Sequence, residues 1–478
     1  MAGRRGESMR PIARRAGGAN LRSGAEPRIK KQTPLSAREM EIVALMAQGL
    51  FNHEIASRLF LAGETVKTHI HHVLGKLGAR SRTHAVAIAL REGLIEQDRL
   101  PARELAEQAP SVPFVDLTPV HADIAGAVVG DIVGLIRTGV FINGPQVRQF
   151  EKAFAEHCGS TACVGLASGL DALRLALLAG GIEPGDEVIV PAYTFAATIE
   201  AVVQAGGEPV LVDVDEHDYT LDPAAVEAAV TERTRFLLPV HLYGQMADMV
   251  ALEEVAERHG LKIVEDACQA HGASRDGHRA GITGLAGAFS FYPSKNLGAF
   301  GDAGALVTDD EQLATRARAF REHGQRRMYV HEVSGYTARL DTIQAVALLH
   351  KLPLLDEWNR QRQAAARFYQ QHLAGIGDLR LPPVPPESEP VWHLFVVRTA
   401  EPEALAAFLG KRAISTGRHY PQPLHRAPAF RRLRHRSAAF PVSERLASEV
   451  LSLPMFPGIR KDQLGAVVAA IADYFQGR

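Results

Sequence analysis

From residue 113 onward, short apolar runs alternate with stretches in which apolar residues recur at helical spacing. The runs at 188–190, 210–212, 236–238, 263–264 and 305–307 are typical of buried strands, and the stretches at 171–178 and 223–230 of the helices between them. This alternation predicts an α/β domain with a largely parallel sheet. Pro353 follows a helix predicted at 341–350. We therefore expect a large domain at 113–352 and a smaller C-terminal domain at 353–478, with a strand at 392–397.

Residues 33–95 have an all-helical pattern instead. Ser36 and Glu39 have the spacing of a capping box, and apolar residues then recur at helical spacing until Gly49. Asn52 is placed to cap a second helix at 54–60, and further helices are predicted at 64–77 and 81–92. Two short helices joined by a tight turn, the second of them carrying basic and polar residues, predict a helix-turn-helix.

Composition and charge describe the remaining segments. The chain has 478 residues, 46% of them hydrophobic, and a formal net charge of -1. Arginines and lysines crowd residues 1–32, where Glu7 and Glu26 are the acidic residues, which predicts a disordered basic tail. Residues 96–112 are polar with two prolines, as expected of a linker.

Other sequence features bear on the location of the protein and on metals. Three cysteines are too few for a disulfide framework and lack metal-ligand spacing. The chain has no apolar stretch of the roughly 18 residues that a membrane helix needs, and no apolar segment behind its N-terminal arginines. We expect a soluble, cytoplasmic protein without a membrane segment and without a bound metal.

One lysine, Lys295, has sequence neighbours that suggest a catalytic role. Lys295 lies between the aromatic run Phe289-Ser-Phe-Tyr292 and a glycine-rich turn, and taken alone it would be read as a surface charge. Upstream, an apolar strand ends at Asp266, with Gln269 three residues later. A lysine that forms a Schiff base and a carboxylate beyond a strand end are what pyridoxal phosphate requires.

At these residues the chain resembles the DegT/StrS family of pyridoxal-phosphate sugar aminotransferases, from about residue 113 to the C-terminus. The resemblance implies a fold-type I enzyme, with a large, mixed but mostly parallel sheet domain and a small C-terminal domain. It implies Lys295 as the catalytic residue, Asp266 as partner of the ring nitrogen and Gln269 as contact to the ring hydroxyl. The backbone at Gly169 and Leu170 and the Ser290 side chain would hold the phosphate, and Phe195 would stack on the ring.

The chain departs from the family pattern at two positions. Leu170 stands where many relatives have threonine, so one side-chain contact to the phosphate is missing. Thr337 stands where an asparagine usually reaches the neighbouring subunit's cofactor, and the family implies a homodimer with shared active sites. The loop His419-Tyr-Pro-Gln-Pro-Leu-His425 resembles the family's loop near the nucleotide-sugar. Its histidines have the alternative role of ordering a proline-rich loop, and we leave them out of the catalytic set.

Residues 33–95 carry a second resemblance, to LuxR-type DNA-binding domains. It rests on Leu35-Ser-Ala-Arg-Glu39, Asn52-His-Glu-Ile-Ala56, Thr65-Val-Lys-Thr-His69 and Lys76-Leu-Gly-Ala-Arg-Ser-Arg82. By this resemblance Lys67, Thr68 and His71 face DNA, whereas Val66, Ile70 and Val73 turn inward. The usual capping serine before the third helix is replaced by Ala62 and Gly63, and Phe51 stands where a small polar residue is commoner. A remnant used for packing or dimerisation is the alternative.

Together these resemblances imply an aminotransferase that moves an amino group, from glutamate, to a keto-sugar attached to a nucleotide diphosphate. Residues 340–345, Asn359 and residues 391–393 favour the 3-keto-6-deoxyhexose branch, such as a dTDP-linked sugar. A sugar dehydratase of the same fold would carry histidine in place of Lys295. A transcriptional regulator whose aminotransferase-like domain senses a ligand, and an active enzyme that also binds DNA, stay open as alternatives.

Overall fold

The computed structural model describes residues 35–47, 50, 52–59, 61–79, 82–92, 94–95, 110–430, 433 and 439–477. The chain divides into two compact units, Met1–Gln108 and Ala109–Arg478, which are described separately. The predicted basic tail at 1–32 and residues 96–109 of the predicted linker lie outside the described residues, as do Gly49 and Phe51. Within the described ranges, no helix is long and apolar enough to cross a membrane.

The N-terminal unit is a small helical bundle with a core of its own. Its helices are α1 (Ala37–Ala47), α2 (Asn52–Leu59), α3 (Gly63–Leu77) and α4 (Arg82–Arg91). Each contributes residues to one apolar cluster, among them Ile42, Ile55, Val66, Val73 and Ile88. The predicted helices agree with these bounds to within two or three residues, because the apolar stripe that defines each helix is also what packs in the core.

The predicted capping box is present at the start of α1. The Ser36 N–H donates to Glu39 Oε2 at 2.7 Å, and the Glu39 N–H donates to Ser36 Oγ at 3.2 Å. Burial alone would raise the pKa of Glu39, but hydrogen bonds from Lys76 and Ser36 outweigh it and lower the pKa to about 2. The carboxylate therefore joins the start of α1 to the end of α3.

Asn52 does not have the capping role that its position suggested. It is the first residue of α2, and its side-chain oxygen accepts a hydrogen bond from Arg82 at 2.9 Å. Arg82 also donates to the backbone oxygen of Leu50. Because the amide oxygen is taken by an arginine distant in sequence, Asn52 ties α2 to the start of α4.

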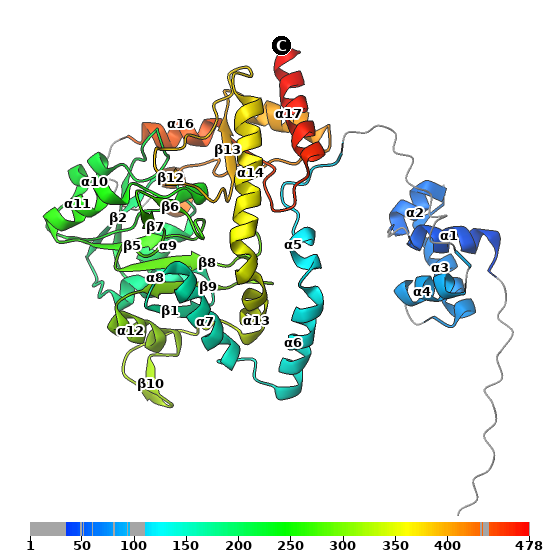
Figure 1. Ribbon diagram of the computed structural model, residues 1–478, viewed down its shortest axis with the longest axis horizontal. Coiled ribbons are helices and arrows are strands. Elements are labelled where there is room, and N and C mark those ends of the chain that lie inside the picture. Colours follow the sequence, from blue (N-terminus) through cyan, green and yellow to red (C-terminus); the bar gives the residue numbers. More distant parts are fainter. Residues whose placement is uncertain are drawn as a thin grey trace, which may run out of the picture. The chain divides into compact units, whose positions relative to one another are not determined.

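The second unit is built on a mixed sheet of seven strands in the order β1-β9-β8-β5-β4-β2-β3 (Figure 1). Its strands are β1 (Ala162–Leu166), β2 (Glu187–Pro191), β3 (Glu208–Val212), β4 (Thr234–Leu237), β5 (Lys262–Asp266), β8 (Ala286–Ser290) and β9 (Gly304–Thr308). Neighbours from β8 to β3 are parallel, whereas β9 is antiparallel to both β1 and β8. The sheet is mostly parallel, as predicted.

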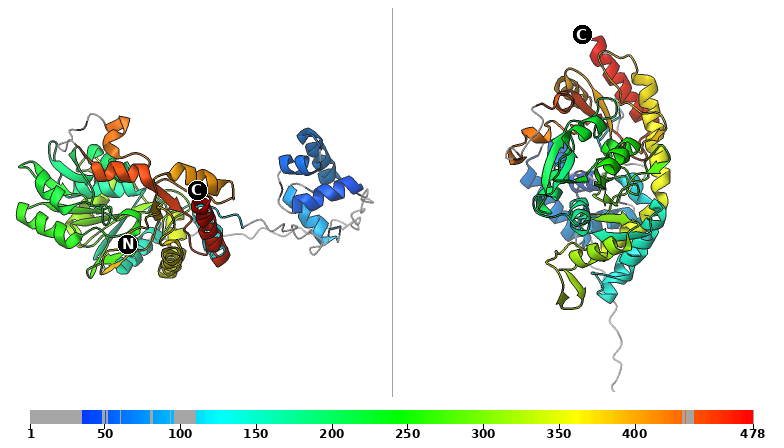
Figure 2. Two further views of the ribbon diagram at one scale, coloured as in Figure 1. Left: turned by 90° about the horizontal axis from the view of Figure 1, so that it is seen from above. Right: turned by 90° about the vertical axis from the view of Figure 1, so that its left-hand side faces the viewer.

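Helices cover both faces of this sheet (Figure 2). One face packs against α8 (Gly169–Ala179), α9 (Ala197–Gln204) and α12 (Glu311–Arg321), and the other against α7 (Pro145–Cys158), α10 (Pro223–Ala229), α11 (Met249–His259) and α13 (Thr342–Lys351). Adjacent strand residues alternate between the two cores: Val188 and Val190 belong to one, and Ile189 to the other. Strands buried on both faces explain the continuous apolar runs in the sequence.

The remaining elements flank this sheet. Before it come α5 (Thr118–Ala122) and α6 (Ala125–Thr138), and after α12 comes the hairpin of β10 (Gln325–Arg327) and β11 (Val330–His331). The C-terminal part has its own cluster, to which α14 (Leu355–Leu373), β13 (Phe395–Arg398), α15 (Pro402–Gly410), β14 (Val450–Leu453) and α17 (Lys461–Gln476) contribute. Three two-residue strands, β6 (Ser274–Arg275), β7 (His278–Arg279) and β12 (Ser388–Glu389), form a small sheet, and α16 (Pro441–Glu449) packs on the α8 side.

The strand predicted at 392–397 begins later, at Phe395, and runs to Arg398. Trp392 has a positive φ of 49°, which strand geometry does not allow. The buried Arg362 donates to the backbone oxygens of Trp392 and His393, both at 3.2 Å. These carbonyls are held by a side chain rather than by a neighbouring strand, so the apolar pattern alone placed the strand start three residues early.

Candidate active site

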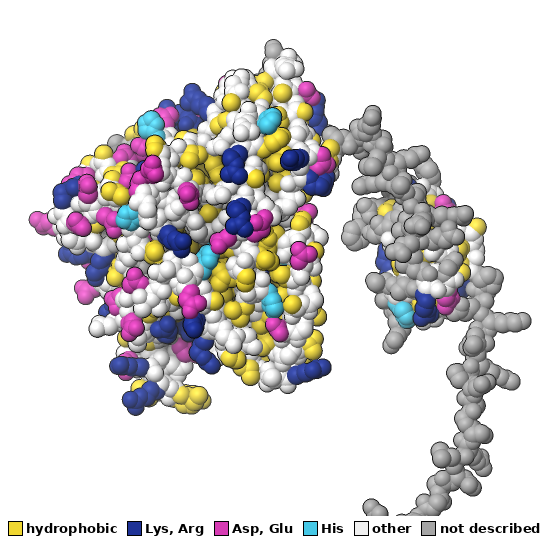
Figure 3. Space-filling view, viewed as in Figure 1, with side chains coloured by type: hydrophobic (Ala, Val, Ile, Leu, Met, Phe, Trp, Pro, Cys, Tyr) yellow, Lys and Arg dark blue, Asp and Glu magenta, His cyan; other side chains and the backbone are white. Residues whose placement is uncertain are grey.

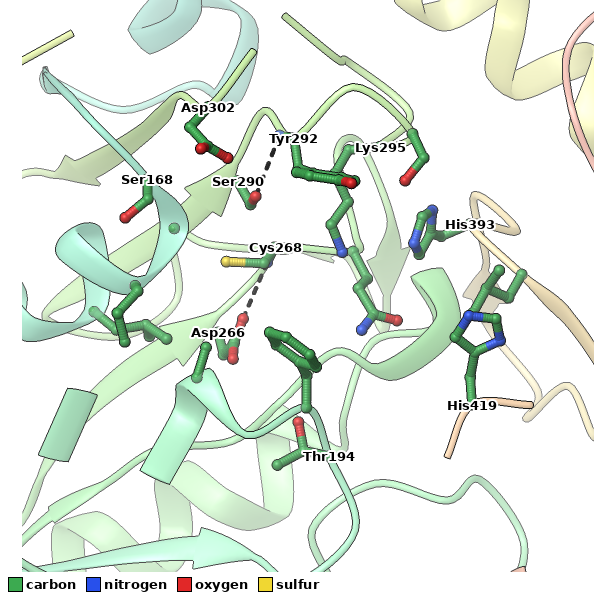
Figure 4. Close-up of a pocket in the computed structure, with 18 of the residues that line it drawn as sticks. Ser168, Thr194, Asp266, Cys268, Ser290, Tyr292, Lys295, Asp302, His393 and His419 are labelled. Atoms are coloured by element: carbon green, nitrogen blue, oxygen red, sulfur yellow. Dashed lines mark hydrogen bonds between the residues drawn. The ribbon is translucent and has the colours of Figure 1, made fainter. Parts of the chain in front are cut away.

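A pocket of about 520 Å³ lies beyond the carboxyl ends of β1, β5 and β8, where parallel α/β sheets bind their ligands (Figure 4). The structure brings to it all seven residues predicted to form the cofactor site: Gly169, Leu170, Phe195, Asp266, Gln269, Ser290 and Lys295. They come from four separate stretches of the sequence. Only the order of strands in the sheet places them together.

The N-terminus of α8 forms one wall of the pocket. Ser168 caps this helix, since its Oγ accepts the N–H of Asp171 at 3.1 Å. The N–H groups of Gly169 and Leu170 belong to the first turn, where a helix supplies no partner, and both residues line the pocket. A Cβ on Gly169 would lie 2.7 Å from both Cys268 Sγ and Ser290 Cβ. The wall therefore requires glycine, and it presents backbone donors suited to an anion.

Lys295 stands on a tight turn after β8 that is fixed from several sides. Its N–H donates to the oxygen of Tyr292 at 2.8 Å. The next residue, Asn296, donates through Nδ2 to Asn359 Oδ1 and to the Val391 oxygen, each at 2.8 Å. Burial lowers the pKa of Lys295, against the opposing influence of Cys268 and Asp266. An amine with a lowered pKa is uncharged, and so nucleophilic and basic, at a lower pH than a free lysine.

Asp266 ends β5 and is buried at the bottom of the pocket. Its Oδ1 accepts the N–H of Cys268 at 3.2 Å, and its Oδ2 accepts the hydroxyl of Thr198 at 2.9 Å. Gln269 is also buried, and its Oε1 accepts the N–H of Tyr243 at 2.8 Å. The Gln269 amide group therefore presents its Nε2, which donates to Tyr420 at 3.2 Å, toward the pocket.

Phe195 and Ser290 complete the predicted set. Phe195 follows β2 with 56% of its surface exposed, and its ring centre is 5.9 Å from that of Tyr420. Ser290 ends β8, and its Oγ accepts the N–H of Tyr292 at 3.3 Å, a contact that does not use the hydroxyl hydrogen. An exposed aromatic ring over a cavity and a hydroxyl near the helix N-terminus can hold a planar ring that carries a phosphate.

Other pocket residues were not assigned to the cofactor site from the sequence. They include Ser168, Thr194, Cys268, Tyr292, Ser294, Asp302, His393 and Tyr420. His393 is buried, burial lowers its pKa well below the usual value, and its Nδ1 has no partner among the described residues. The signal for it was a histidine inside an apolar run, a position in which a core histidine is equally expected.

The two histidines of the loop at 419–425 lie in different surroundings. His419 lines the pocket, and burial together with the nearby Lys295 charge lowers its pKa to about 4. His425 is instead 3.0 Å from Glu444, outside the pocket. Thr337 is also outside, and its hydroxyl oxygen is 3.1 Å from His323 Nε2.

In the N-terminal unit, the residues predicted to face DNA lie on the exposed side of α3. Lys67, Thr68 and His71 are exposed, whereas Val66 and Val73 are fully buried and Ile70 packs against the same core. Ala62 offers α3 no side-chain cap, as the sequence indicated. Lys67 pairs with Glu64 at 2.5 Å, and the Thr68 hydroxyl donates to the Glu64 backbone oxygen at 3.0 Å.

The class of protein follows from three features: the order of strands in the sheet, the turn that carries Lys295 and the carboxylate of Asp266 at the end of β5. They are those of a fold-type I aminotransferase, here joined to a helix-turn-helix unit. The chain belongs to the DegT/DnrJ/EryC1/StrS aminotransferase family, whose sequence pattern matches residues 123–472. Enzymes of this family depend on pyridoxal phosphate. Residues 33–89 match a second pattern, that of bacterial regulatory proteins of the luxR family.

Two curated relatives are similar over the aminotransferase unit. The dTDP-3-amino-3,4,6-trideoxy-alpha-D-glucose transaminase of Streptomyces venezuelae is 46% identical over 77% of this chain and 97% of its own length. The erythromycin biosynthesis sensory transduction protein EryC1 of Saccharopolyspora erythraea is 46% identical over 75% of this chain and 98% of its own.

Two solved structures are similar as well. DesV of S. venezuelae has a TM-score of 0.75 at 46% identity and covers 77% of this chain and 99% of its own. NtdA of Bacillus subtilis, with the bound cofactor PMP, has a TM-score of 0.71 at 32% identity and covers 77% and 85%.

Proposed function

We propose that the protein is a pyridoxal-phosphate aminotransferase that transfers an amino group from glutamate to a nucleotide-linked keto-deoxysugar, a dTDP-3-keto-6-deoxyhexose. The observation that carries the proposal is the convergence of the Lys295 amine, the Asp266 carboxylate and the N-terminus of α8 on one pocket. Two relatives, from Streptomyces venezuelae and Micromonospora megalomicea, are both named dTDP-3-amino-3,4,6-trideoxy-alpha-D-glucose transaminase, which supports the sugar and the nucleotide. Lys295 itself argues against a dehydratase, in which histidine would replace it.

The pocket fits pyridoxal phosphate in size and in chemistry. Its volume of about 520 Å³ is in the range of small-molecule sites. Because no Cβ fits beside Gly169, the first turn of α8 packs directly against Ser290, and the backbone donors of the helix and the Ser290 hydroxyl line the same part of the pocket. These groups suit a phosphate, the buried Asp266 suits a protonated ring nitrogen, and Gln269 Nε2 suits a ring oxygen.

Each residue then has a separate task. When bound, the cofactor supplies an aldehyde that takes up amines and a ring that accepts electrons. The N–H groups of Gly169 and Leu170 would hold the phosphate, and the Phe195 ring would stack on the cofactor ring. Asp266 would accept a hydrogen bond from the ring nitrogen. Lys295 Nζ takes the proton from the Cα atom of the amino donor and delivers a proton to the sugar carbon that receives nitrogen.

Of the residues that suggested the 3-keto branch, Asn359 acts through the lysine turn. Asn359 is buried, its Oδ1 accepts a hydrogen bond from Asn296 Nδ2 at 2.8 Å, and its own Nδ2 donates to the His271 backbone oxygen at 2.9 Å. It is therefore placed to hold the turn that carries Lys295 rather than to bind sugar. The residues before β13 include His393, which lines the pocket and is placed to contact the sugar.

We further propose that the active enzyme is a homodimer whose sites are completed by the neighbouring subunit. On α6 the side chains of Val129, Val133 and Ile136 are 59%, 40% and 64% exposed, and hydrophobic atoms gather there in Figure 3. An apolar helix face of this kind is typical of an interface. Of the described residues that line the pocket, only Lys295 is a lysine or arginine, so an anionic substrate needs positive charge from elsewhere.

An absorbance spectrum of the purified full-length protein tests the enzymatic proposal. We expect a visible band from cofactor held by Lys295, and a shift of that band toward the near ultraviolet when glutamate is added. A visible band that no amino donor moves would favour a regulator that keeps the cofactor as a ligand. A protein without any band after reconstitution would contradict the proposal.

For the N-terminal unit we propose DNA binding through α3, which tethers the enzyme to promoters of its own pathway or tunes them. Lys67→Ala should weaken DNA binding about 10-fold, since one phosphate contact is lost. The slope of log binding constant against log salt concentration should fall by about one. Lys152→Ala also removes one positive charge, but from α7, and should change neither the affinity for DNA nor its salt dependence. Mobility shifts with the upstream promoter fragment and a random fragment provide the measurement. Equal binding to both, or none, would end the regulatory part of the proposal.

A further inference from the structure

We infer that two buried threonines, Thr194 and Thr198, form a hydroxyl chain that ends on Asp266 and positions this carboxylate for the cofactor ring. The inference rests on the proposed use of pyridoxal phosphate and assigns roles to residues that the sequence did not single out. Thr198 lies in the first turn of α9 and is fully buried, and Thr194 is 2% exposed. Neither contributes a charge.

The direction of the chain follows from counting hydrogens. Thr198 Oγ1 donates its one hydroxyl hydrogen to Asp266 Oδ2 at 2.9 Å. The two threonine oxygens are 3.1 Å apart, and Thr198 has no second hydrogen to give. Thr194 is therefore the donor in that contact. Both hydroxyl groups point the same way, from the pocket wall toward the carboxylate.

Packing alone does not call for a hydroxyl at position 198. Its neighbours in α9, Ile199 and Val202, belong to the hydrophobic core, where valine would have the same shape as threonine. A buried hydroxyl is costly unless it is hydrogen-bonded. The Thr198 side chain does not cap α9 either, because the N-cap residue is Ala196 and no side chain caps this helix. The bond to Asp266 is thus what the oxygen atom contributes.

The chain fixes the plane of the Asp266 carboxylate and sets which of its lone pairs stay available. With the N–H of Cys268 on Oδ1 and the hydroxyl of Thr198 on Oδ2, each oxygen has one donor from the protein and retains capacity for another. Hydrogen bonds to a carboxylate favour its ionised form, and bonds in series strengthen one another. With both donors coming from the protein, the carboxylate would act as the acceptor toward the ring nitrogen, and a proton held on that nitrogen would make the ring a better electron acceptor.

Thr198→Val tests this, because it removes the hydroxyl and keeps the shape. The full-length protein is stripped of cofactor and reconstituted with pyridoxal phosphate labelled with ¹⁵N in the ring, and the ¹⁵N spectrum reports the proton on that nitrogen. We expect a protonated nitrogen in the wild type, a shift toward the unprotonated value in Thr198→Val, and a Kd for the cofactor that is about 10-fold higher. Thr198→Ser, which keeps the hydroxyl, should restore both values, and Thr194→Val should give a smaller change of the same sign.

A matched control removes a buried hydroxyl elsewhere. Thr308 ends β9, is 3% exposed and donates to the backbone oxygen of Leu285 at 2.7 Å. Thr308→Val should lower thermal stability as Thr198→Val does, and leave the ¹⁵N shift and the Kd unchanged. If the Thr198→Val variant binds the cofactor with the wild-type ¹⁵N shift and the wild-type Kd, the inference about the threonines is wrong, while the proposed function stands. If the wild-type protein binds no cofactor, both the proposed function and this inference are wrong.

Discussion

Replacing Lys295 with alanine is expected to abolish the visible absorbance band and to slow the reaction with glutamate by about 10⁴-fold, the upper range for loss of a proton-transfer group. The variant loses both the amine that holds the cofactor and the base at the substrate carbon. Lys295→Arg should fail equally, although it keeps a positive charge, because a guanidinium stays protonated. Single-turnover absorbance after mixing with glutamate measures the effect.

Lys152→Ala serves as the control for this experiment. Lys152 lies on α7 with 79% of its side chain exposed, so its removal should leave the band and the rate unchanged. The fold should survive in all three variants, and thermal unfolding checks this. A Lys295→Ala protein that processes glutamate at the wild-type rate would refute the assignment of Lys295.

The second large effect is expected from Gly304→Ala, which adds one methyl group at the start of β9. Its Cβ would lie 2.3 Å from the carbonyl carbon and oxygen of Ser168, and 2.7 Å from Gly169 N. These are backbone atoms, so no side-chain rotation can relieve the clash, and the N-terminus of α8 must move. We expect a loss of stability of about 3 kcal/mol, at the upper end for overpacking, and at least about 10-fold weaker cofactor binding.

Gly301→Ala is the matched comparison, three residues earlier in the same segment. The added Cβ there would meet Gln344 Nε2 at 2.9 Å, which is the far end of a flexible side chain. This substitution should change stability by less than about 1 kcal/mol. Thermal unfolding of both variants, with and without pyridoxal phosphate, provides the comparison. Equal unfolding temperatures and equal cofactor affinities in the two variants would show that α8 does not need the close approach of β9.

The sheet was largely predictable because its strands are buried on both sides. Runs such as Val188-Ile-Val190 fill two cores at once, so they carry a strong apolar signal. β8 does not give this apolar signal, because it begins with the small residues Ala286-Gly-Ala288. A Cβ on Gly287 would lie 2.1 Å from the oxygen of Gly281, so close backbone packing, rather than hydrophobicity, selects the residue there. A pattern of apolar positions cannot register that requirement.

The site was predictable only where its residues stand in contiguous motifs. Asp266 and Gln269 lie in one such stretch and Ser290 and Lys295 in another, and all four line the pocket. His393 and Tyr420 stand in two segments that the family resemblance linked to the sugar, and the packing of the C-terminal part brings both to the pocket. Thr198 was missed. Its contribution is one hydrogen bond from a buried hydroxyl, and the sequence does not indicate the partner of such a group.

The two units have separate hydrophobic cores, and this bears on the order of events during synthesis. The N-terminal unit can complete its core from residues 35–95 alone, since every residue of its apolar cluster lies in that range. At a usual rate of about 5–20 residues per second, the ribosome needs roughly 20–70 s more to add Ala109–Arg478. A nascent chain would thus carry a finished helix-turn-helix for tens of seconds before its aminotransferase unit exists.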